Sequence, residues 1–281
     1  DADALLKEED PDIVAVVTPT KYYKEIVLAC VETGVKAVST DKPIGAVLAD
    51  VDEMIETCEA RGVLLAGGYL QRAKSEVQQT ARRIRAGEFG DLVGARVAGW
   101  GNEISGGGCQ HVSILRLFTG AEVDEVMAWS MPAAGMSPHL LPTNGDAGLN
   151  INGMFRLSNG LDCPVFGREY PSEGVDVWSE DALVQWRFGA PEIFKGFDDR
   201  GARKRFDPQY EPYEWSEFDY LTGSARSFLA AIDTGSEPWV TGRDLRAALE
   251  VAIAAKLSAD LGSVPVKLPL KDRSLSLYPA D

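Results

Sequence analysis

The first hundred residues alternate two hydrophobic patterns. Short, continuous apolar runs are typical of strands buried on both faces, and apolar residues spaced three or four apart are typical of helices packed on one side. The runs predict strands at residues 12–18, 35–40 and 63–66, and the spaced residues predict helices at 21–33, 47–60 and 72–86. Strand–helix units of this length favour a parallel sheet with right-handed crossovers.

From residue 92 the pattern changes to alternating runs, with no intervening helix long enough to be a crossover. We expect strands at 92–100, 123–129, 149–157, 161–170 and 181–188, and helices at about 110–118, 220–234 and 242–261. The fold class is therefore α/β plus α+β, with a partial Rossmann-type parallel sheet followed by a second domain with an open, mainly antiparallel sheet.

Two segments of the second domain do not follow either pattern. Residues 131–146, rich in Pro, Gly and Ala, are expected to form a mobile surface loop, and residues 191–215 an irregular segment. The open sheet needs a cover on its outer face, and Trp178, Trp186 and Phe188 are expected there. Apolar side chains in that position favour sheet-to-sheet association of subunits.

Composition narrows the function classes. The formal net charge of −15, from 43 acidic and 28 basic residues, argues against a nucleic acid partner. No run reaches the ~18 apolar residues that a membrane span needs. The four cysteines lack the spacing of a zinc site and there are two histidines, so we expect no metal and buried thiols. A cytoplasmic location is favoured, with an upstream targeting segment left open because the chain begins at Asp1.

Polar or glycine-rich tripeptides follow three successive predicted strands: Thr18-Pro19-Thr20, Asp41-Lys42-Pro43 and Gly67-Gly68-Tyr69. Ligands of parallel sheets bind beyond the carboxyl ends of the strands. These three tripeptides are therefore expected to line one crevice.

The string DIVAVVTPTKYYKEIVLACVETGVKAVSTDKP, residues 12–43, resembles the core of the glucose–fructose oxidoreductase, inositol dehydrogenase and rhizopine catabolism (Gfo/Idh/MocA) family. The closing GRDLRAALEVAIAAKLSADLGSVPVKLPL is similar to the last helix and tail of that family. The resemblance implies an NAD(P)-dependent oxidoreductase that acts on the CH–OH group of a sugar, sugar derivative or cyclitol, as a homo-dimer or homo-tetramer. Residues 1–100 would belong to the dinucleotide-binding domain and 101–281 to the substrate and oligomerisation domain, with the last helix able to pack back on the first.

Lys42 is the residue on which the predicted chemistry depends. A lysine at a strand end beside a nicotinamide can hydrogen-bond the hydroxyl that is oxidised and stabilise the developing alkoxide. The family places its catalytic lysine in this tripeptide; the alternative is a solvated lysine before a turn proline. Asp41 stands where the family usually has Glu and would contact the nicotinamide ribose or the lysine, and the bond before Pro43 is expected to be cis.

The resemblance implies further contacts around Lys42. Cofactor contacts would come from Thr18, Pro19 and Thr20 beneath the nicotinamide and from Tyr23, which stands where the family often has His. Substrate contacts would come from Tyr69, Gln71 and Arg72, from Trp100 and Asn102, and from His111.

His111 is the second candidate acid–base residue. It follows a glycine loop that resembles the one before the catalytic histidine of the family. Many members carry an Asp four residues before that histidine, but Gly107 occupies the position here. His111 is thus either the proton acceptor or a helix-start histidine bonded to backbone; in the second case Lys42, or Tyr69, would manage the proton.

The glycine fingerprint that cradles a pyrophosphate is not found in these 281 residues. The chain is thus expected to be part of a longer dehydrogenase, or a natural short form. On the first hypothesis the strand at 12–18 has an open edge, and an edge covered by another strand of this chain would contradict it. Two other functions stay open: a non-catalytic sugar-binding or regulatory homologue, and a glycoside-cleaving or dehydratase variant that uses a transient keto sugar.

Overall fold

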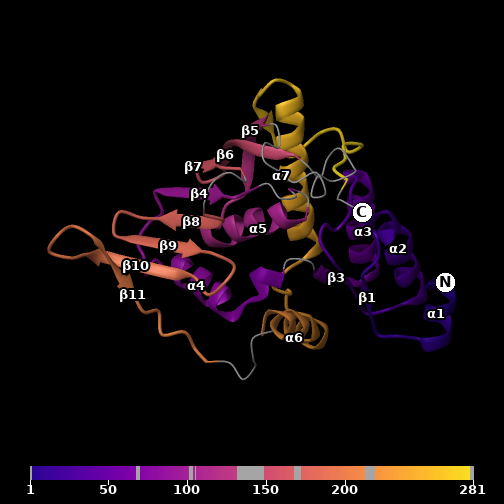
Figure 1. The fold of residues 1–281 in the computed structure, drawn as a ribbon. Coiled ribbons are helices and arrows are strands. Elements are labelled where there is room, and N and C mark those ends of the chain that lie inside the picture. The colour runs from indigo at the N-terminus through magenta and orange to yellow at the C-terminus, as the bar shows by residue number, and fades with distance from the viewer. Residues whose placement is uncertain are drawn as a thin grey trace, which may run out of the picture.

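A computed structural model describes residues 2–67, 70–100, 104, 106–131, 149–167, 172–212 and 219–278. It contains two separate sheets that lie at opposite ends of the molecule, joined across the long helix α7 (Gly242–Asp260) (Figure 1). The predicted fold class is confirmed, with a parallel sheet first and a mainly antiparallel sheet second.

The first sheet has three parallel strands in the order β1-β2-β3, namely β1 (Ile13–Val16), β2 (Ala37–Thr40) and β3 (Leu64–Gly67). One face is covered by α2 (Tyr23–Thr33) and α3 (Leu48–Arg61), with α1 (Ala2–Glu9) against α2. Both crossover helices end at a glycine in the left-handed conformation, Gly34 after α2 and Gly62 after α3.

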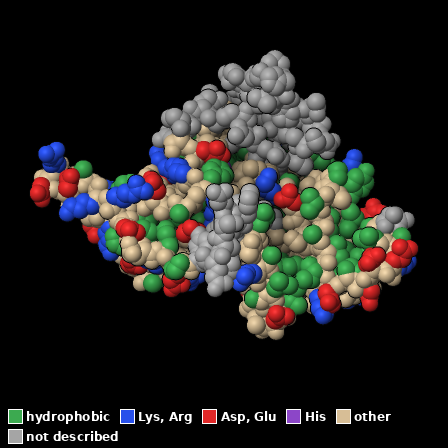
Figure 2. All heavy atoms as spheres, turned by 60° about the horizontal axis from the view of Figure 1, so that its bottom comes forward, with side chains coloured by type: hydrophobic (Ala, Val, Ile, Leu, Met, Phe, Trp, Pro, Cys, Tyr) green, Lys and Arg blue, Asp and Glu red, His purple; other side chains and the backbone are tan. Residues whose placement is uncertain are grey.

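The opposite face of this sheet is only partly covered. Helix α6 (Asp219–Thr234) lies over β2 and β3, where Phe228 packs on Ala37 and Ala66. On the same face of β1, Ile13 and Val17 are 37% and 75% exposed, and β2 is the one described strand that pairs with β1. The expected open edge at β1 is therefore present in the described chain. Figure 2 shows hydrophobic side chains gathered beside α6 on this face.

The second sheet has nine strands in the order β11-β10-β9-β8-β4-β7-β6-β5-β12. All neighbours are antiparallel except β4 and β7. The strands are β4 (Gly94–Ala98), β5 (Val123–Met131), β6 (Asn150–Leu157), β7 (Asp162–Val165), β8 (Gly174–Trp178), β9 (Ala182–Trp186), β10 (Glu192–Phe197), β11 (Arg203–Phe206) and β12 (Val266–Lys267). One face packs on α5 (Gly107–Thr119) and α7.

Between the two sheets the chain passes through η2 (Leu70–Ala73) and α4 (Ser75–Arg85), and within the first domain η1 (Thr20–Tyr22) connects β1 to α2. The helix predicted at 72–86 thus begins with a separate 3-10 turn. Among the described residues no helix has the length and apolar character required to cross a membrane.

Two expectations about the second sheet are wrong. Part of the segment 191–215 forms the β10–β11 hairpin, in which Asp198 accepts hydrogen bonds from the turn amides of Arg200 and Ala202. Trp186 and Phe188 pack against His111 beneath α5 instead of facing outward, because the alternation of β9 turns Trp186 to the helix-covered side. Most of the expected loop at 131–146 lies outside the described residues.

A cluster of charged side chains connects helix α7 and the C-terminal tail to helix α3 of the first domain. Arg273 and Arg246 contact the carboxylate of Asp52 on α3 at 2.6 and 2.7 Å, and Arg273 also contacts the buried Glu250. Burial would raise the pKa of Asp52, but the two arginines outweigh it and lower the pKa. Removing one member of such a cluster leaves an unpaired charge, so the network holds α7 against α3.

Candidate functional site

The carboxyl ends of β1, β2 and β3 meet at one edge of the first sheet, as the topology predicts. Gly67 ends β3 at φ +108, and a Cβ there would lie 2.5 Å from Ser39 Oγ and 2.7 Å from the Thr40 carbonyl oxygen. A side chain would separate the two strands, so glycine at this position allows β3 to approach the start of the Asp41-Lys42-Pro43 turn.

That turn presents Lys42 in a half-buried position, after which the chain passes through a cis Lys42–Pro43 bond, as expected. The Asp41 carboxylate accepts a hydrogen bond from the Lys42 backbone N–H at 2.8 Å and so fixes its own turn. Among the described carboxylates none lies within ion-pairing distance of the Lys42 ammonium. The ammonium is therefore available to a ligand.

Two polar side chains lie beneath this turn. Tyr23 is 2% exposed; burial raises the pKa of its phenol, and the charge of Asp41 raises it further against the effect of the Asp41 backbone amide. Tyr23 thus supports the turn from below. Thr40 is 3% exposed and its Oγ1 has no hydrogen-bond partner in the described structure, a position sequence reasoning missed. A buried hydroxyl without a protein partner is normally satisfied by an ordered water, an ion or a ligand.

The turn after β1 supplies an accessible surface next to Lys42. Thr18 and Pro19 are exposed and Thr20 is half-buried at the start of η1. These residues, with the orphaned Thr40 hydroxyl and the Lys42 ammonium, fit the flat, polar nicotinamide end of a dinucleotide. The glycine loop for its pyrophosphate is not part of this chain's sequence.

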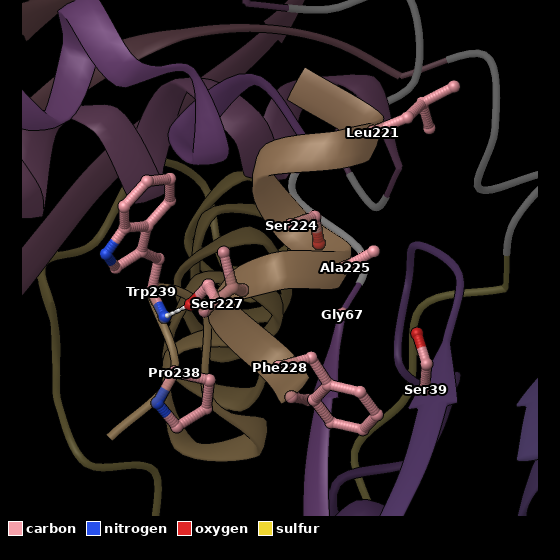
Figure 3. A pocket seen from close by; sticks show the side chains of 11 residues that line it. Ser39, Gly67, Leu221, Ser224, Ala225, Ser227, Phe228, Pro238 and Trp239 are labelled. Carbon is pink, nitrogen blue, oxygen red and sulfur yellow. Dashed lines mark hydrogen bonds between the residues drawn. The ribbon is translucent and has the colours of Figure 1, made fainter. Parts of the chain in front are cut away.

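A cavity of about 240 Å³ lies beside the ends of β2 and β3, under α6 (Figure 3). Ser39, Ala66 and Gly67 form its floor and Phe228 on α6 closes it from above. On the far side, the Trp239 backbone N–H donates to Ser227 Oγ at 2.7 Å and fixes the wall. The cavity adjoins the strand ends and adds hydroxyl groups to their polar surface.

The predicted substrate residues lie on η2 and on α5, which contact each other. Gln71 on η2 and Gln110 in the first turn of α5 each have a buried amide oxygen without a described partner. Sugar hydroxyls donate to such oxygens. Tyr69 and Asn102 lie outside the described residues.

The guanidinium of Arg72 is engaged by protein groups, unlike the unpartnered oxygens of Gln71 and Gln110. Its Nε donates to the Trp239 carbonyl at 2.9 Å, and its Nη1 lies 3.2 Å from Asp244, which also binds Arg116 at 2.9 Å. Burial lowers the pKa of Arg72, opposed by the charge of Asp244. These contacts favour a structural role in which Arg72 joins η2 to α5 and α7.

Trp100 was expected to stack on the sugar, and the structure corrects this. Its side chain is fully buried, its indole N–H donates to the Gly108 carbonyl at 2.8 Å, and its ring packs edge-on against Phe155. No face of the ring is left for a ligand. Trp100 instead anchors the glycine turn from which α5 begins.

His111 is 1% exposed and lies among aromatic rings, with Trp186 and Phe188 centroids at 5.7 and 5.5 Å. Burial lowers the pKa of His111 to about 4; the Gly107 backbone opposes this effect and the charge of Arg187 adds to it. Its Nε2 lies 3.6 Å from a carboxylate oxygen of Glu173, a residue that the sequence did not single out. The imidazole is therefore neutral at physiological pH, and the carboxylate of Glu173 lies next to its Nε2.

Lys42 and the cofactor residues around it gather at one sheet edge, and Gln71, Gln110 and His111 gather where η2 meets α5. Among the described residues no group of three or more His, Cys, Asp or Glu side chains is arranged to hold a metal ion. The chemistry available is that of a lysine, a carboxylate–imidazole pair and hydrogen-bonding amides.

Comparison with known proteins agrees with this arrangement. Residues 1–69 match the profile of an oxidoreductase family with an NAD-binding Rossmann fold, GFO_IDH_MocA. The chain is 34% identical over 102 residues to 2,7-anhydro-N-acetylneuraminate hydratase of Mediterraneibacter gnavus, a stretch that covers 36% of this chain and 27% of that protein. It is 25% identical over 280 residues to myo-inositol 2-dehydrogenase of Thermotoga maritima, covering 92% of this chain and 81% of the relative.

Solved structures share the whole fold. Aldose-aldose oxidoreductase from Caulobacter crescentus, complexed with glycerol, matches 95% of this chain and 82% of its own with a TM-score of 0.76 at 21% identity. An inositol dehydrogenase homologue from Azotobacter vinelandii, complexed with NADH and myo-inositol, matches the same shares with a TM-score of 0.77 at 14% identity. The profile match over residues 1–69, the curated relatives and the shared architecture make the chain similar to oxidoreductases of the Gfo/Idh/MocA family.

Proposed function

We propose that this chain transfers hydride between the CH–OH carbon of a sugar, sugar derivative or cyclitol and NAD or NADP. The observation that carries the proposal is Lys42, held at a parallel strand end by the Asp41 turn, with no described carboxylate on its ammonium. A positive charge at that point stabilises the alkoxide that forms as the hydroxyl is oxidised.

The cofactor supplies a two-electron hydride acceptor when it is bound. Thr18, Pro19 and Thr20 would support the nicotinamide, with Asp41 towards its ribose and Tyr23 bracing the turn from below. The first hundred residues would thus carry the cofactor, and the rest the substrate and subunit contacts. All four cysteines are free and buried, which supports a reducing, cytoplasmic compartment.

The substrate class that we propose follows from the unpartnered groups on η2 and α5. The unpartnered amide oxygens of Gln71 and Gln110 accept hydrogen bonds, and a polyol offers several hydroxyl donors at once. Relatives named for myo-inositol, D-apiose and D-glucosides support a polyhydroxylated ring or chain. Tyr69 and Asn102 stay proposals for the same pocket, alongside Gln71.

A second copy of the chain is the partner that we propose for the outer face of the second sheet. Met127 and Trp129 on β5 are 37% and 42% exposed, and they alternate with the buried Val126 and Ala128. Such a face favours a homo-dimer or homo-tetramer. Sedimentation analysis of the wild type and of Trp129→Lys tests it, with dissociation expected in the variant.

The function itself is tested with NAD and NADP against a panel of inositols, aldoses and glucosides. Hydride transfer is read from the absorbance of the reduced nicotinamide, and cofactor binding is measured in parallel by calorimetry. Turnover that requires Lys42 supports the proposal; binding of polyols without any reduction of either cofactor would leave a sugar-binding or regulatory protein.

The hydratase relative favours one second candidate, net addition or removal of water through a transient keto sugar. That reaction leaves the nicotinamide in its starting state. Product analysis by mass spectrometry distinguishes it from oxidation, because the sugar changes by the mass of one water and not of two hydrogens.

A further inference from the structure

Glu173 is a half-exposed carboxylate directed at a fully buried imidazole. Its side chain is 43% exposed, whereas His111 is 1% exposed, and the two meet at 3.6 Å between Oε1 and Nε2. This distance exceeds a normal N–H···O hydrogen bond of ~3 Å, and catalytic hydrogen bonds of unliganded sites are often long in this way. Of the two groups, Glu173 is the one that a substrate can reach.

The backbone is shaped to hold Glu173 there. Gly99, just past the end of β4, has φ +70, and a Cβ on it would lie 2.7 Å from Glu173 Cγ and 2.8 Å from its Cβ. Gly174, the next residue along the chain, has φ +145, and its added Cβ would strike the Trp186 carbonyl oxygen at 2.0 Å. Two glycines in conformations that other residues rarely adopt thus seat one carboxylate against α5.

Apart from Glu173, the Gly107 backbone is the polar group that acts on the imidazole, and the remaining neighbours offer it no partner. Trp186 and Phe188 present ring atoms to it. The two nearby cations are held elsewhere, since Arg187 binds Asp176 at 2.5 Å and Lys74 donates to the Phe188 carbonyl at 2.5 Å. Neither ring nitrogen makes a hydrogen bond to a described residue, so Glu173 is the acceptor that the structure offers to Nε2.

The pair lies beside the proposed polyol pocket. Lys74 directly follows η2, so its bond to Phe188 connects the segment of Gln71 to the aromatic cage of His111. Gln110, with its unpartnered amide oxygen, immediately precedes His111. If the proposed polyol site at Gln71 and Gln110 is correct, Glu173 is the exposed acid in contact with the residue next to Gln110.

We propose that Glu173 is the group that exchanges the proton with the substrate hydroxyl, and that His111 is its positioning residue, donating Nε2–H to the carboxylate. In oxidation the carbinol carbon gives up a hydride with its electron pair to the nicotinamide. The hydroxyl proton passes to a carboxylate oxygen of Glu173, and a carbonyl forms; reduction reverses each transfer. The inference rests on the proposed oxidoreductase function and deepens it. It takes the place of the direct base role that the sequence suggested for His111.

The electrostatics agree with these roles. Burial raises the pKa of Glu173, which makes the carboxylate a better proton acceptor near neutral pH. The low pKa of His111 keeps the imidazole neutral, so it carries one N–H to give. The charge of Arg187, directly after β9, acts on the ring, and Glu173, directly before β8, lies 3.6 Å from it. Lys74, directly after η2, binds the carbonyl of Phe188, whose ring contacts the imidazole.

Histidine NMR tests the contact without substrate or cofactor. The chain has two histidines, so a His139→Asn variant assigns the His111 signals. We expect nitrogen-15 shifts of the Nε2–H tautomer in the wild type and in Glu173→Asp. In Glu173→Ala the tautomer should change towards Nδ1–H. A tautomer that does not respond to Glu173→Ala would overturn the pairing.

Kinetics test the role of the pair. Glu173→Gln is expected to lower kcat by about 100- to 1,000-fold and to remove the acid limb of the pH–rate profile, with partial recovery in Glu173→Asp. Glu180→Gln, an exposed acid at the other end of β8, is the matched control. Full activity of Glu173→Gln sinks this inference and leaves the proposed function standing. If the wild type reduces neither cofactor with any polyol, the proposed function is wrong, and so is the acid–base role of Glu173. The contact between His111 and Glu173 is tested independently of both by the NMR experiment.

Discussion

The two halves of the candidate site are built in opposite ways. At the edge of the first sheet, Lys42 and Thr18 stand on short turns, partly open to solvent, with polar groups to spare. In the second half, which includes α5, the side chains of His111 and Trp100 are buried among aromatic rings. The carboxylate of Glu173 is exposed to solvent and contacts His111. An open edge can receive a large cofactor, while a closed, apolar surround sets the protonation state of the groups within it. Under the proposed function, charge stabilisation falls to the first half and proton exchange to the second.

Replacing Lys42 by Met should have the largest effect, because it removes the positive charge from the open half while keeping the length of the side chain. We expect kcat for polyol oxidation to fall by about 100- to 10,000-fold. Lys36→Met is the control, since Lys36 is 61% exposed and pairs only with the exposed Asp12 among the described residues. A Lys42→Met enzyme with wild-type kcat would remove the basis for assigning alkoxide stabilisation to this half.

The second prediction concerns the ion-pair cluster of Asp244, which connects η2 to α5. Asp244 binds Arg72 from η2 and Arg116 from α5, and all three side chains are at most 15% exposed. Asp244→Asn keeps a side chain able to cap α7, but it removes the counter-charge of the buried Arg72 and leaves the buried Arg116 with only the exposed Glu122 among the described residues. We expect a loss of about 3 kcal/mol in the free energy of unfolding, measured with urea.

The control for the stability loss in Asp244→Asn is the exposed ion pair between Arg116 and Glu122. Glu122 binds Arg116 but is 59% exposed, so Glu122→Gln should cost less than ~1 kcal/mol. Equal losses in the two variants would mean that burial of the Asp244 cluster does not decide its contribution.

The two halves also differ in what the sequence could predict. The place of Lys42, Asp41 and Thr18 at one edge of the sheet could be predicted because a strand end is a local pattern and parallel topology collects strand ends at one edge. Glu173 was missed because 61 residues separate it from His111, and only the register of β4 and β8 brings Gly99 under it. Trp100 was misplaced because an aromatic residue after a strand gives no local sign of which side will be covered.

The closed half should be visible in the pH dependence of stability. The pKa of His111 is about 4 in the folded protein, below the ordinary value of 6.5, so the unfolded chain takes up the proton first. Stability from this residue is therefore intact above about pH 6.5 and is lost as the pH falls towards 4. At pH 5 we expect a loss of about 2 kcal/mol relative to pH 8.

His111→Phe isolates this contribution, since a phenyl ring can pack between Trp186 and Phe188 without titrating. Urea unfolding of both proteins at several pH values gives the difference directly. The variant should lose about 2 kcal/mol less than the wild type between pH 8 and pH 5. Parallel curves for the two proteins would show that the imidazole titrates normally and that the second half is more open than the structure indicates.

Trp100→Phe is expected to affect stability but not substrate binding, and it separates a structural tryptophan from a sugar-stacking one. The phenyl ring keeps the contact with Phe155 but loses the hydrogen bond to the Gly108 carbonyl that fixes the start of α5. Stability should fall by about 1–3 kcal/mol, because the carbonyl is left without its donor and the smaller ring leaves a gap. KM for the polyol should not change, since no face of Trp100 is open to it. A raised KM with unchanged stability would instead place the indole against the sugar and make this half of the site as open as the first.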